Sequence, residues 1–391
     1  MQGSNHDDVR RRNLSVILRL VHRAGPVSRS QLTRVTGLNR STIAALVGEL
    51  AELGLAEERE PDATNQVGRP SMMVAASDHV VALAVNPEID AVTIGVVGLG
   101  GTVHRRIREA MAQSPSAADA VATTVDVLQR MRAELGPRFR FVGVGVAVPG
   151  LVRAHDGLVR HAPHLGWVDE PLAGMLEAAT GLRVFAANDA STGAMAERHF
   201  GAGRGITDLI YLNGGASGIG GGLIVGGAPA GGVAGYAGEF GHTRVSSSAA
   251  TDSAGIAGTL EAEVTRSALL DLLGQGTLDP DDFERALLAS TSPQVRHEVE
   301  RQLDHLAVAL AGAINILNPQ LVVLGGFLAS IHAVDPERLR AAVGRLTLPV
   351  PFDSVRICPA QLGSNLLMIG AAELVFERLL DDPGGFVLPA G

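Results

Sequence analysis

The sequence predicts an α/β protein that opens with a winged helix-turn-helix and continues into two related lobes with a cleft between them. Three observations predict this fold class. Residues 10–54 place apolar side chains at helical spacing and are divided by glycines, as in three short helices. Residues 54–76 then read as two strands around a polar loop, which is a wing. From residue 78 onward, strands and helices follow in the order β-β-β-α-β-α-β-α, and this order occurs twice.

The N-terminal helices can be placed from their caps and breakers. Ser28 stands where the N-cap of the second helix is expected, and Gly37 ends that helix. The third helix follows at once, with Asn39 or Ser41 as its cap. A short helix, a tight turn with glycine and a longer helix form the helix-turn-helix pattern, and we assign residues 1–75 to this domain. The alternative is a three-helix packing module that does not bind DNA.

The charge distribution favours DNA binding by this domain. The formal net charge is −9, which argues against a basic coat over the whole chain. Between Val9 and Gly48, however, there are eight arginines and no Asp or Glu. The chain contains no lysine, so every fixed positive side chain is a guanidinium, which makes forked contacts to phosphate. An arginine-rich, acid-free helical stretch beside a wing is typical of a DNA-binding domain.

The candidate DNA-contacting residues lie at the starts of the second and third helices and in the wing. The amino end of the third helix is expected to enter the major groove, while the start of the second meets phosphate. Arg69, in the tripeptide GRP, suits either a minor-groove contact or a plain turn. The candidates are Ser28, Arg29, Ser30, Asn39, Arg40, Ser41, Thr42 and Arg69.

The region after the wing divides into two halves. We expect a first lobe over residues 78–190 and a second over residues 191–364, with a helix at 365–381 that packs back on the first lobe. Two long helices are expected within residues 256–318. The sole tryptophan, Trp167, suits either stacking on a sugar ring or a place in the core.

Composition gives the expected surroundings of the protein. At 391 residues the chain is too long for one ordinary core, and 46% hydrophobic residues are typical of a globular protein. Cys358 is the only cysteine, which excludes an intrachain disulfide framework and suits a reducing cytoplasm. Residues 306–334 carry no Asp, Glu, Lys or Arg, but the interior sequence NILNPQ interrupts them. We therefore expect a cytoplasmic protein with no membrane partner.

A polar cluster stands in a segment of small residues. The segment YAGEFGHTRVSSSAATDSAGIAGTLEAE, residues 236–263, holds Glu239, His242 and Glu261. Titratable groups with so little bulk around them are typical of the wall of a binding site. They would otherwise be loop residues that only hydrogen-bond the backbone. Asp189 follows the strand RVFAAN and suits the N-cap of the next helix.

Several of these motifs stand in a familiar order. A winged helix-turn-helix followed by VPG, AND, GIGGG, GEFGH and GTLE resembles the ROK family of repressors and sugar kinases, from about residue 10 to residue 380. The resemblance implies a two-lobed, actin-like fold of the ribonuclease H-like, sugar-kinase type after the DNA-binding domain. It also implies that members with this N-terminal domain are sugar-responsive transcription factors.

The resemblance assigns roles to five residues. In kinases of the family an Asn-Asp pair contacts sugar hydroxyls, and its Asp is the general base; the pair corresponds to Asn188-Asp189. The Glu and His of the family's GE-x-GH correspond to Glu239 and His242, and a downstream Glu to Glu261. Carboxylates accept from neighbouring hydroxyls, while Asn and His offer both a donor and an acceptor. These five residues are the candidate sugar-binding set.

Two departures from the family pattern bear on cofactors. The family's ATP-phosphate loop, Asp-x-Gly-Gly-Thr, is replaced by NPEID at residues 86–90. A phosphate cradle needs glycines, and Glu88 adds a negative charge instead, so ATP binding is not expected. Family members bind zinc with the His of GH and three cysteines, but residues 243–258 contain none. We therefore predict no metal, no cofactor and no catalytic residue, with Asp189 as the relict position of a base.

The sequence thus predicts a sugar-responsive DNA-binding transcriptional regulator, a repressor of carbohydrate metabolism genes, without kinase activity. Its expected partners are a palindromic double-stranded operator, a sugar or sugar derivative, and further copies of itself in a homodimer or tetramer. One alternative is a ROK-type sugar kinase that phosphorylates a hexose with ATP and uses Asp189 as base. Another is a protein-docking domain that binds no small ligand.

Overall fold

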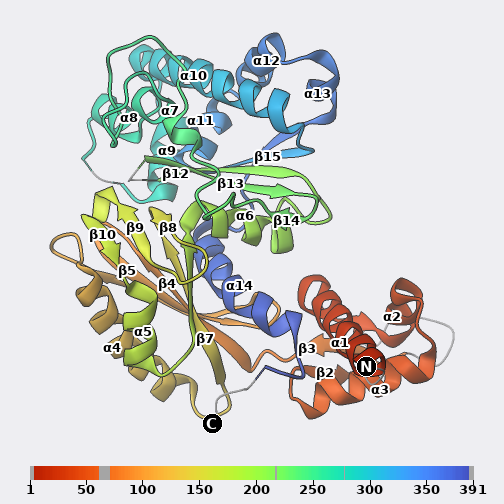
Figure 1. The fold of residues 1–391 in the computed structure, drawn as a ribbon. Helices are drawn as coiled ribbons and strands as arrows, with labels where there is room; N and C mark the ends of the chain where they lie inside the picture. Colours follow the sequence, from red (N-terminus) through yellow and green to blue (C-terminus); the bar gives the residue numbers. More distant parts are fainter. Residues whose placement is uncertain (1–3, 61–70, 216–217, 277, 387–391) are drawn as a thin grey trace.

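The protein consists of an N-terminal DNA-binding-type domain and two α/β lobes (Figure 1). The computed structural model describes residues 4–60, 71–215, 218–276 and 278–386. Two helices, α6 (Asp189–Phe200) and α14 (Leu366–Asp381), lie where the three parts meet (Figure 1).

The N-terminal domain, called the head below, is a winged helix-turn-helix over the described residues 4–60 and 71–76. The Ser28 side chain accepts a hydrogen bond from the Gln31 amide and caps the second helix, which ends at Gly37 with φ +72°. Asn39 rather than Ser41 caps the third helix, accepting from the Thr42 amide. The elements are α1 (Ser4–Ala24), β1 (Val27–Ser28), α2 (Arg29–Thr36), α3 (Arg40–Glu52), β2 (Ala56–Arg59) and β3 (Met73–Ala76), with sheet order β1-β3-β2.

The first lobe is built on a mixed sheet of strand order β11-β7-β4-β5-β6. Strand β4 pairs antiparallel with β5 and parallel with β7, which in turn pairs parallel with β11. The main elements are β4 (Val80–Pro87), β5 (Ala91–Gly98), β6 (Val103–Ala110), α4 (Ala117–Leu135), β7 (Arg140–Val148), α5 (Leu172–Thr180) and β11 (Val184–Asn188). A small sheet adds β8 (Leu151–Val152), β9 (Val159–Ala162), the short helix η1 (Pro163–Leu165) and β10 (Trp167–Glu170).

The second lobe repeats this plan with strand order β14-β13-β12-β15-β16. Its strands are β12 (Leu209–Gly215), β13 (Gly218–Val225), β14 (Ala228–Pro229), β15 (Leu321–Gly326) and β16 (Arg356–Pro359). Its helices are η2 (Phe240–His242), α7 (Leu260–Glu263), α8 (Arg266–Leu272), α9 (Pro280–Ala289), α10 (Pro293–Leu317), α11 (Phe327–Val334), α12 (Pro336–Leu346) and α13 (Pro349–Ser354), with η3 (Gly363–Asn365) leading into α14.

The prediction of two long helices within residues 256–318 is wrong for the first of them. Only α10 is long, and the chain before it forms three shorter helices. Gly274 adopts φ +66° after α8, and both α9 and α10 begin with proline, which cannot continue a preceding helix.

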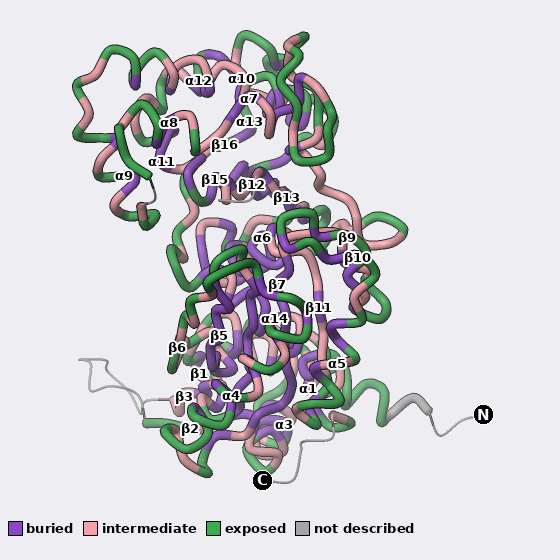
Figure 2. The backbone as a smooth tube through the Cα atoms, turned by 90° about the vertical axis from the view of Figure 1, so that its left-hand side faces the viewer, coloured by how far each residue is buried: buried purple, intermediate pink, exposed green. Residues whose placement is uncertain are grey.

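Helix α14 lies very close to the first-lobe sheet and to α6. At Gly145 of β7, an added Cβ would overlap the carbonyl group of Ala371; at Gly370, it would overlap the backbone of Thr192 in α6. The two glycines therefore allow backbone to touch backbone. Figure 2 shows α14 as buried backbone alongside the central strands of the first lobe.

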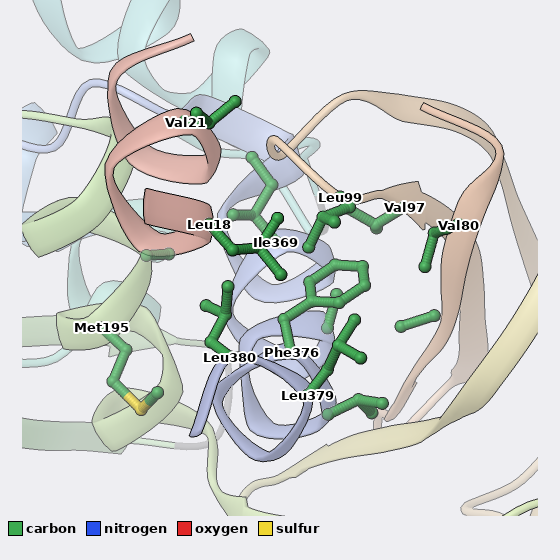
Figure 3. Close-up of a cluster of buried hydrophobic side chains, with 14 of the residues drawn as sticks. Leu18, Val21, Val80, Val97, Leu99, Met195, Ile369, Phe376, Leu379 and Leu380 are labelled. Atoms are coloured by element: carbon green, nitrogen blue, oxygen red, sulfur yellow. The ribbon is translucent and has the colours of Figure 1, made fainter. Parts of the chain in front are cut away.

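One hydrophobic cluster runs from the head through α14 into the first lobe. Leu18 and Val21 of α1 lie beside Ile369 and Phe376 of α14, and Met195 of α6 joins the same cluster (Figure 3). The head and the first lobe thus share apolar surface, and the apolar side of α1 is buried there. Within the described ranges, none of the helices is long and apolar enough to cross a bilayer.

We expect Gly145→Ala to lower the free energy of unfolding by about 1–3 kcal/mol, because the new methyl group forces α14 away from β7. The measurement is urea unfolding followed by circular dichroism. Gly174→Ala in α5 is the matched control, since its added Cβ meets nothing within 4 Å, and it should leave stability unchanged or raise it slightly. Equal stability of the two variants would show that the contact between β7 and α14 tolerates an added methyl group.

Candidate functional site

The candidate site begins where β11 ends and α6 starts. The Asn188 side chain caps α6: its Oδ1 accepts from the Ser191 amide at 3.0 Å, and its Nδ2 donates to the Gly150 carbonyl at 3.2 Å. Asn188, and not Asp189, is therefore the N-cap. Asp189 lies in the first turn, where its Oδ1 accepts from the Ala190 amide at 2.8 Å.

The other three candidate residues come from two second-lobe segments. Glu239 directly precedes the short helix η2, His242 is its last residue, and Glu261 stands in the first turn of α7. The His242 Nε2 atom lies 3.9 Å from the Glu239 carboxylate. The charge of Glu239 acts on Asp189, and that of Glu261 acts on both Glu239 and His242. The fold therefore brings Asp189, Glu239, His242 and Glu261 close enough to interact electrostatically, and Asn188 adjoins Asp189.

The environment favours the protonated form of two of these carboxyl groups. Burial, together with the charge of Glu239, raises the pKa of Asp189 to about 7, although part of its surface stays accessible. Burial and the charge of Glu261 also raise the pKa of Glu239, against the opposing effect of His242. A carboxyl group that titrates near pH 7 can donate or accept a hydrogen bond there.

A residue that the sequence reasoning missed, Asp252, orients His242. Its Oδ2 lies 2.8 Å from His242 Nδ1 and also accepts from Thr259 Oγ1 at 2.9 Å. Its Oδ1 accepts from the amides of Ala254 and Ile256 at 2.9 and 2.8 Å. Since a carboxylate with these partners accepts, His242 Nδ1 carries a proton and the Nε2 atom is left on the side of Glu239.

The charges around His242 favour its protonated form. Burial lowers the pKa of His242, but the hydrogen bond to Asp252 and the charge of Glu261 outweigh it and raise the pKa. Burial likewise tends to raise the pKa of Asp252, yet its hydrogen bonds hold that pKa below the usual range. The pair is thus stabilised as imidazolium and carboxylate.

Zinc, which the family resemblance implies, does not fit these residues. His242, Asp252 and Thr259 satisfy one another by hydrogen bonds, and no thiolate lies in this loop. Structural zinc takes four ligands with nitrogen and sulfur donors. The loop is closed further by Ser246, whose hydroxyl donates to Glu263 at 2.6 Å.

Glu261 is largely engaged by the protein. Its Oε1 accepts from the Ser253 hydroxyl and amide at 2.5 and 3.1 Å, and its Oε2 accepts from the Ile219 amide at 3.0 Å. These bonds tie strand β13 to the loop before α7. Because each carboxylate oxygen has two lone pairs, Glu261 still has capacity for a ligand hydroxyl.

Residues 86–90, where the family has its ATP-phosphate loop, form an internally paired turn. Asn86 is buried and donates to the Ala147 carbonyl at 2.9 Å. Glu88 accepts from the Thr93 hydroxyl at 2.8 Å and lies 3.2 Å from Arg108, which also binds Asp90 at 2.7 Å. The turn is thus an acidic, internally paired hairpin rather than a row of free amides.

Seven of the predicted DNA-contacting residues lie at the N-terminal ends of α2 and α3. Arg29 is held by Glu58 through two contacts of 2.5 and 2.6 Å, and Ser30 lies 2.9 Å from the Ser28 hydroxyl.

At the start of the third helix, Arg40 is exposed and forms no ion pair with any described residue. Ser41 donates to the capping Asn39 at 2.8 Å, and Thr42 gives that cap its amide. Arg69 lies outside the described residues.

Trp167 belongs to the core. It is 2% exposed, and its indole N–H donates to the Pro115 carbonyl at 2.9 Å. Of the two interpretations left open by the sequence, stacking on a sugar ring is therefore wrong.

The fold and the site define a class: a winged helix-turn-helix joined to two actin-like lobes that bring a polar, carboxylate-rich set together. The sequence profile described as "ROK family" matches residues 89–378. The chain belongs to the ROK family. The resemblance and the fold class predicted from the sequence are confirmed.

Individual relatives include regulators and kinases. A xylose repressor of Caldicellulosiruptor bescii is 24% identical over 396 residues, covering 97% of this chain and 99% of its own. A solved ROK family transcriptional regulator, described as a homologue of the E. coli MLC protein, superposes with a TM-score of 0.78 at 23% identity, over 95% of this chain and 97% of that one. A ROK family glucokinase from Streptomyces griseus, in complex with glucose and AMPPNP, gives 0.64 at 26% identity, over 76% of this chain and 99% of that one.

We expect Asp189→Asn to gain stability relative to the wild type as the pH rises. The native pKa of Asp189, about 7, exceeds its usual value of 3.8, so the native state keeps a proton that the unfolded state has lost. Stability from the neutral form is therefore lost as the pH rises from about 4 through 7, and the Asn variant avoids this loss.

The measurement is urea unfolding at pH 4.5, 6 and 8. Asp271→Asn, on the exposed surface of α8, is the control and should run parallel to the wild type. A constant difference between Asp189→Asn and the wild type at all three pH values would contradict the assigned environment of Asp189.

Proposed function

We propose that this protein is a sugar-responsive DNA-binding transcriptional regulator, a repressor of carbohydrate metabolism genes, that binds a sugar and does not phosphorylate it. One observation carries the proposal: a winged helix-turn-helix with an exposed Arg40 is joined to lobes that retain all five residues of the family's sugar-contacting pattern, while residues 86–90 form an acidic turn. The full-length match to a protein named xylose repressor supports the same assignment.

The chemistry of the five candidate residues suits a hexose or a related sugar. A sugar ring presents neighbouring hydroxyls that each donate and accept. Asp189, with a pKa of about 7, can change between acceptor and donor at little cost, and the pKa of Glu239 is shifted in the same direction by burial. Small residues line the approach, since an added Cβ at Gly220 would come within 3.9 Å of the Asp189 carboxylate. We infer that Asn188, Asp189, Glu239, His242 and Glu261 bind the effector sugar.

The alternative function is a sugar kinase that uses Asp189 as its base. The Asn188-Asp189 pair and the likeness to a glucokinase solved with glucose and AMPPNP favour it. Against it, Glu88 places a carboxylate where the family's phosphate loop has glycine, and like charges repel. We therefore propose that neither nucleotide nor zinc takes part in the function. Binding of the sugar instead changes the arrangement of the two lobes.

Control of DNA binding needs only a small coupling energy. If the sugar prefers one arrangement of the lobes and DNA the other, a difference of about 1.4 kcal/mol in sugar binding shifts operator affinity tenfold. We propose a homodimer, or a tetramer built from it, that reads two half-sites of a palindrome separated by whole helical turns. Such a protein acts in the cytoplasm, where the DNA is.

We expect at least one sugar from a panel of D-xylose, D-glucose, N-acetylglucosamine and their phosphates to raise the melting temperature of the protein. Because the candidate residues hydrogen-bond the ring, Asp189→Asn and Glu239→Gln should each weaken this binding roughly tenfold or more. A coupled assay with ATP should give no turnover with the same sugars. Turnover that disappears in Asp189→Asn would establish the kinase instead, and a panel without any shift would favour the protein-docking alternative.

We expect Arg40→Ala to weaken binding to DNA selected from a random pool by about 10- to 100-fold, because the third helix loses a base or phosphate contact at its amino end. The selected sequences should be palindromic. Binding is measured by fluorescence anisotropy at physiological salt. Arg345→Ala, exposed in α12 of the second lobe, is the control and should bind like the wild type. Unchanged affinity in Arg40→Ala would refute the placement of the recognition helix.

A further inference from the structure

The head is fastened to the sensor lobes by three buried side chains from three helices. They are His22 of α1, His199 of α6 and Glu373 of α14, which are 1%, 8% and 1% exposed. The Glu373 Oε1 atom lies 2.9 Å from His22 Nε2, and its Oε2 lies 2.6 Å from His199 Nδ1. We call these three residues the joint.

The hydrogen bonds fix the proton positions at the head side of the joint. The Gly100 amide donates to His22 Nδ1 at 2.9 Å, so His22 carries its proton on Nε2 and donates it to Glu373. Burial acts to raise the pKa of Glu373, but the hydrogen bonds from both histidines oppose it and hold the pKa below its usual range. Glu373 is thus a buried carboxylate with one oxygen committed to the head and the other to α6.

The surroundings make this carboxylate sensitive to the loss of either partner. The edges of Phe200 and Phe376 pack on His22 at ring-centroid distances of 5.3 and 5.6 Å, so water is kept away. A buried carboxylate that loses a donor keeps its desolvation cost without the compensating bond. A movement of α6 that withdraws His199 from Glu373 therefore also changes the hydrogen bond between Glu373 and His22.

Helix α6 connects the candidate sugar site to the joint. Asn188 caps its first turn, Asp189 begins it, and His199 stands near its last residue. Ten residues of α-helix span about 15 Å, and a helix of this length moves as a rigid rod. Near the same end, Glu197 accepts from the amides of Gln361 and Leu362 at 2.8 and 3.0 Å, so α6 also holds the segment that leads into α14.

The contact between head and sensor contains opposed forces, as a releasable contact requires. Around the joint, Glu377 binds both Arg19 and Arg23 of α1. Arg198 of α6 faces Arg23, and burial together with this like charge lowers the pKa of Arg198. The Nε atoms of both arginines are buried without a partner among the described residues. The docked head is therefore held by acidic side chains against repulsion between guanidinium groups.

A metal site is not the better interpretation of this cluster. The side chains of His199, Glu373 and Glu377 lie close enough together to share a cation. Both oxygens of Glu373 are already bound by histidines, however, and Glu377 is paired with two arginines. These positive groups oppose a further cation.

We propose that the joint of His22, Glu373 and His199 transmits sugar occupancy from the amino end of α6 to the DNA-binding head. This inference rests on the proposed function, because it gives the route by which the same site is coupled to DNA. A sugar bound at Asn188 and Asp189 shifts α6, His199 moves relative to Glu373, and α1 changes its position or its freedom on α14. Coupling of this kind needs an element with two arrangements that both sites bias, and α6 with the docked head is that element.

The test compares three variants in the full-length protein. His199→Leu removes the donor on α6 and leaves the head contacts of Glu373 in place. His199→Asn keeps an N–H donor close to the position of Nδ1 and is the conservative rescue. Asp381→Asn removes a partner of Arg19 on α1 without touching α6, and it is the matched control for a weaker head contact. The readouts are hydrogen exchange of α1 amides, with α10 as internal reference, and DNA affinity with and without D-xylose, D-glucose or N-acetylglucosamine.

We expect His199→Leu to speed exchange in α1 at least tenfold and to abolish the change in DNA affinity caused by sugar, while the sugar still raises the melting temperature. Asp381→Asn should change exchange less than threefold and keep the sugar response, and His199→Asn should resemble the wild type. If His199→Leu leaves α1 exchange and the sugar response intact, the joint does not transmit the signal. If no sugar affects wild-type DNA binding, the proposed function fails, and the exchange data separately decide whether α6 holds the head.

Discussion

The structure depends on the close contact between α14 and its neighbours. Gly145 and Gly370 let the backbone of this helix touch β7 and α6, and the apolar side of the helix then reaches the head. The apolar residues of the head belong to one cluster with this helix, whereas each lobe also has a cluster of its own. The head is therefore not a loosely tethered reader, and its position is set by the same packing that sets the lobes (Figure 3).

Hydrogen bonds orient the ionisable groups of the candidate site. Asp252 accepts four hydrogen bonds and fixes the ring of His242, while Glu261 joins β13 to the following loop. Second-layer bonds of this kind give a binding residue a defined orientation, which a metal otherwise supplies. The two carboxyl groups with raised pKa values suit the proposed sugar, whose hydroxyls both donate and accept.

Local sequence signals predicted the helices of the head, whereas contacts between residues far apart in the sequence could not be predicted. Ser28, Asn39 and Gly37 act within one helical turn of their own position, so the helix-turn-helix could be predicted from the sequence. The break-up of the chain before α10 does have a local signal, because α9 and α10 begin at Pro280 and Pro293. Nothing near His22 indicates that it meets Glu373, which lies 351 positions away. The role of Asp252 depends on how a glycine-rich loop folds back on itself, and residue spacing does not specify that.

The pairing of α1 with α14 also has a consequence for biosynthesis. Roughly 350 residues separate the two helices, which at about 5–20 residues per second corresponds to about 20 to 70 s of translation. During that interval the side of α1 that packs on α14 lacks its final partner, and Leu18 and Val21 are without the apolar contacts of that helix. A nascent or truncated polypeptide therefore differs from the finished one in the packing of the head itself.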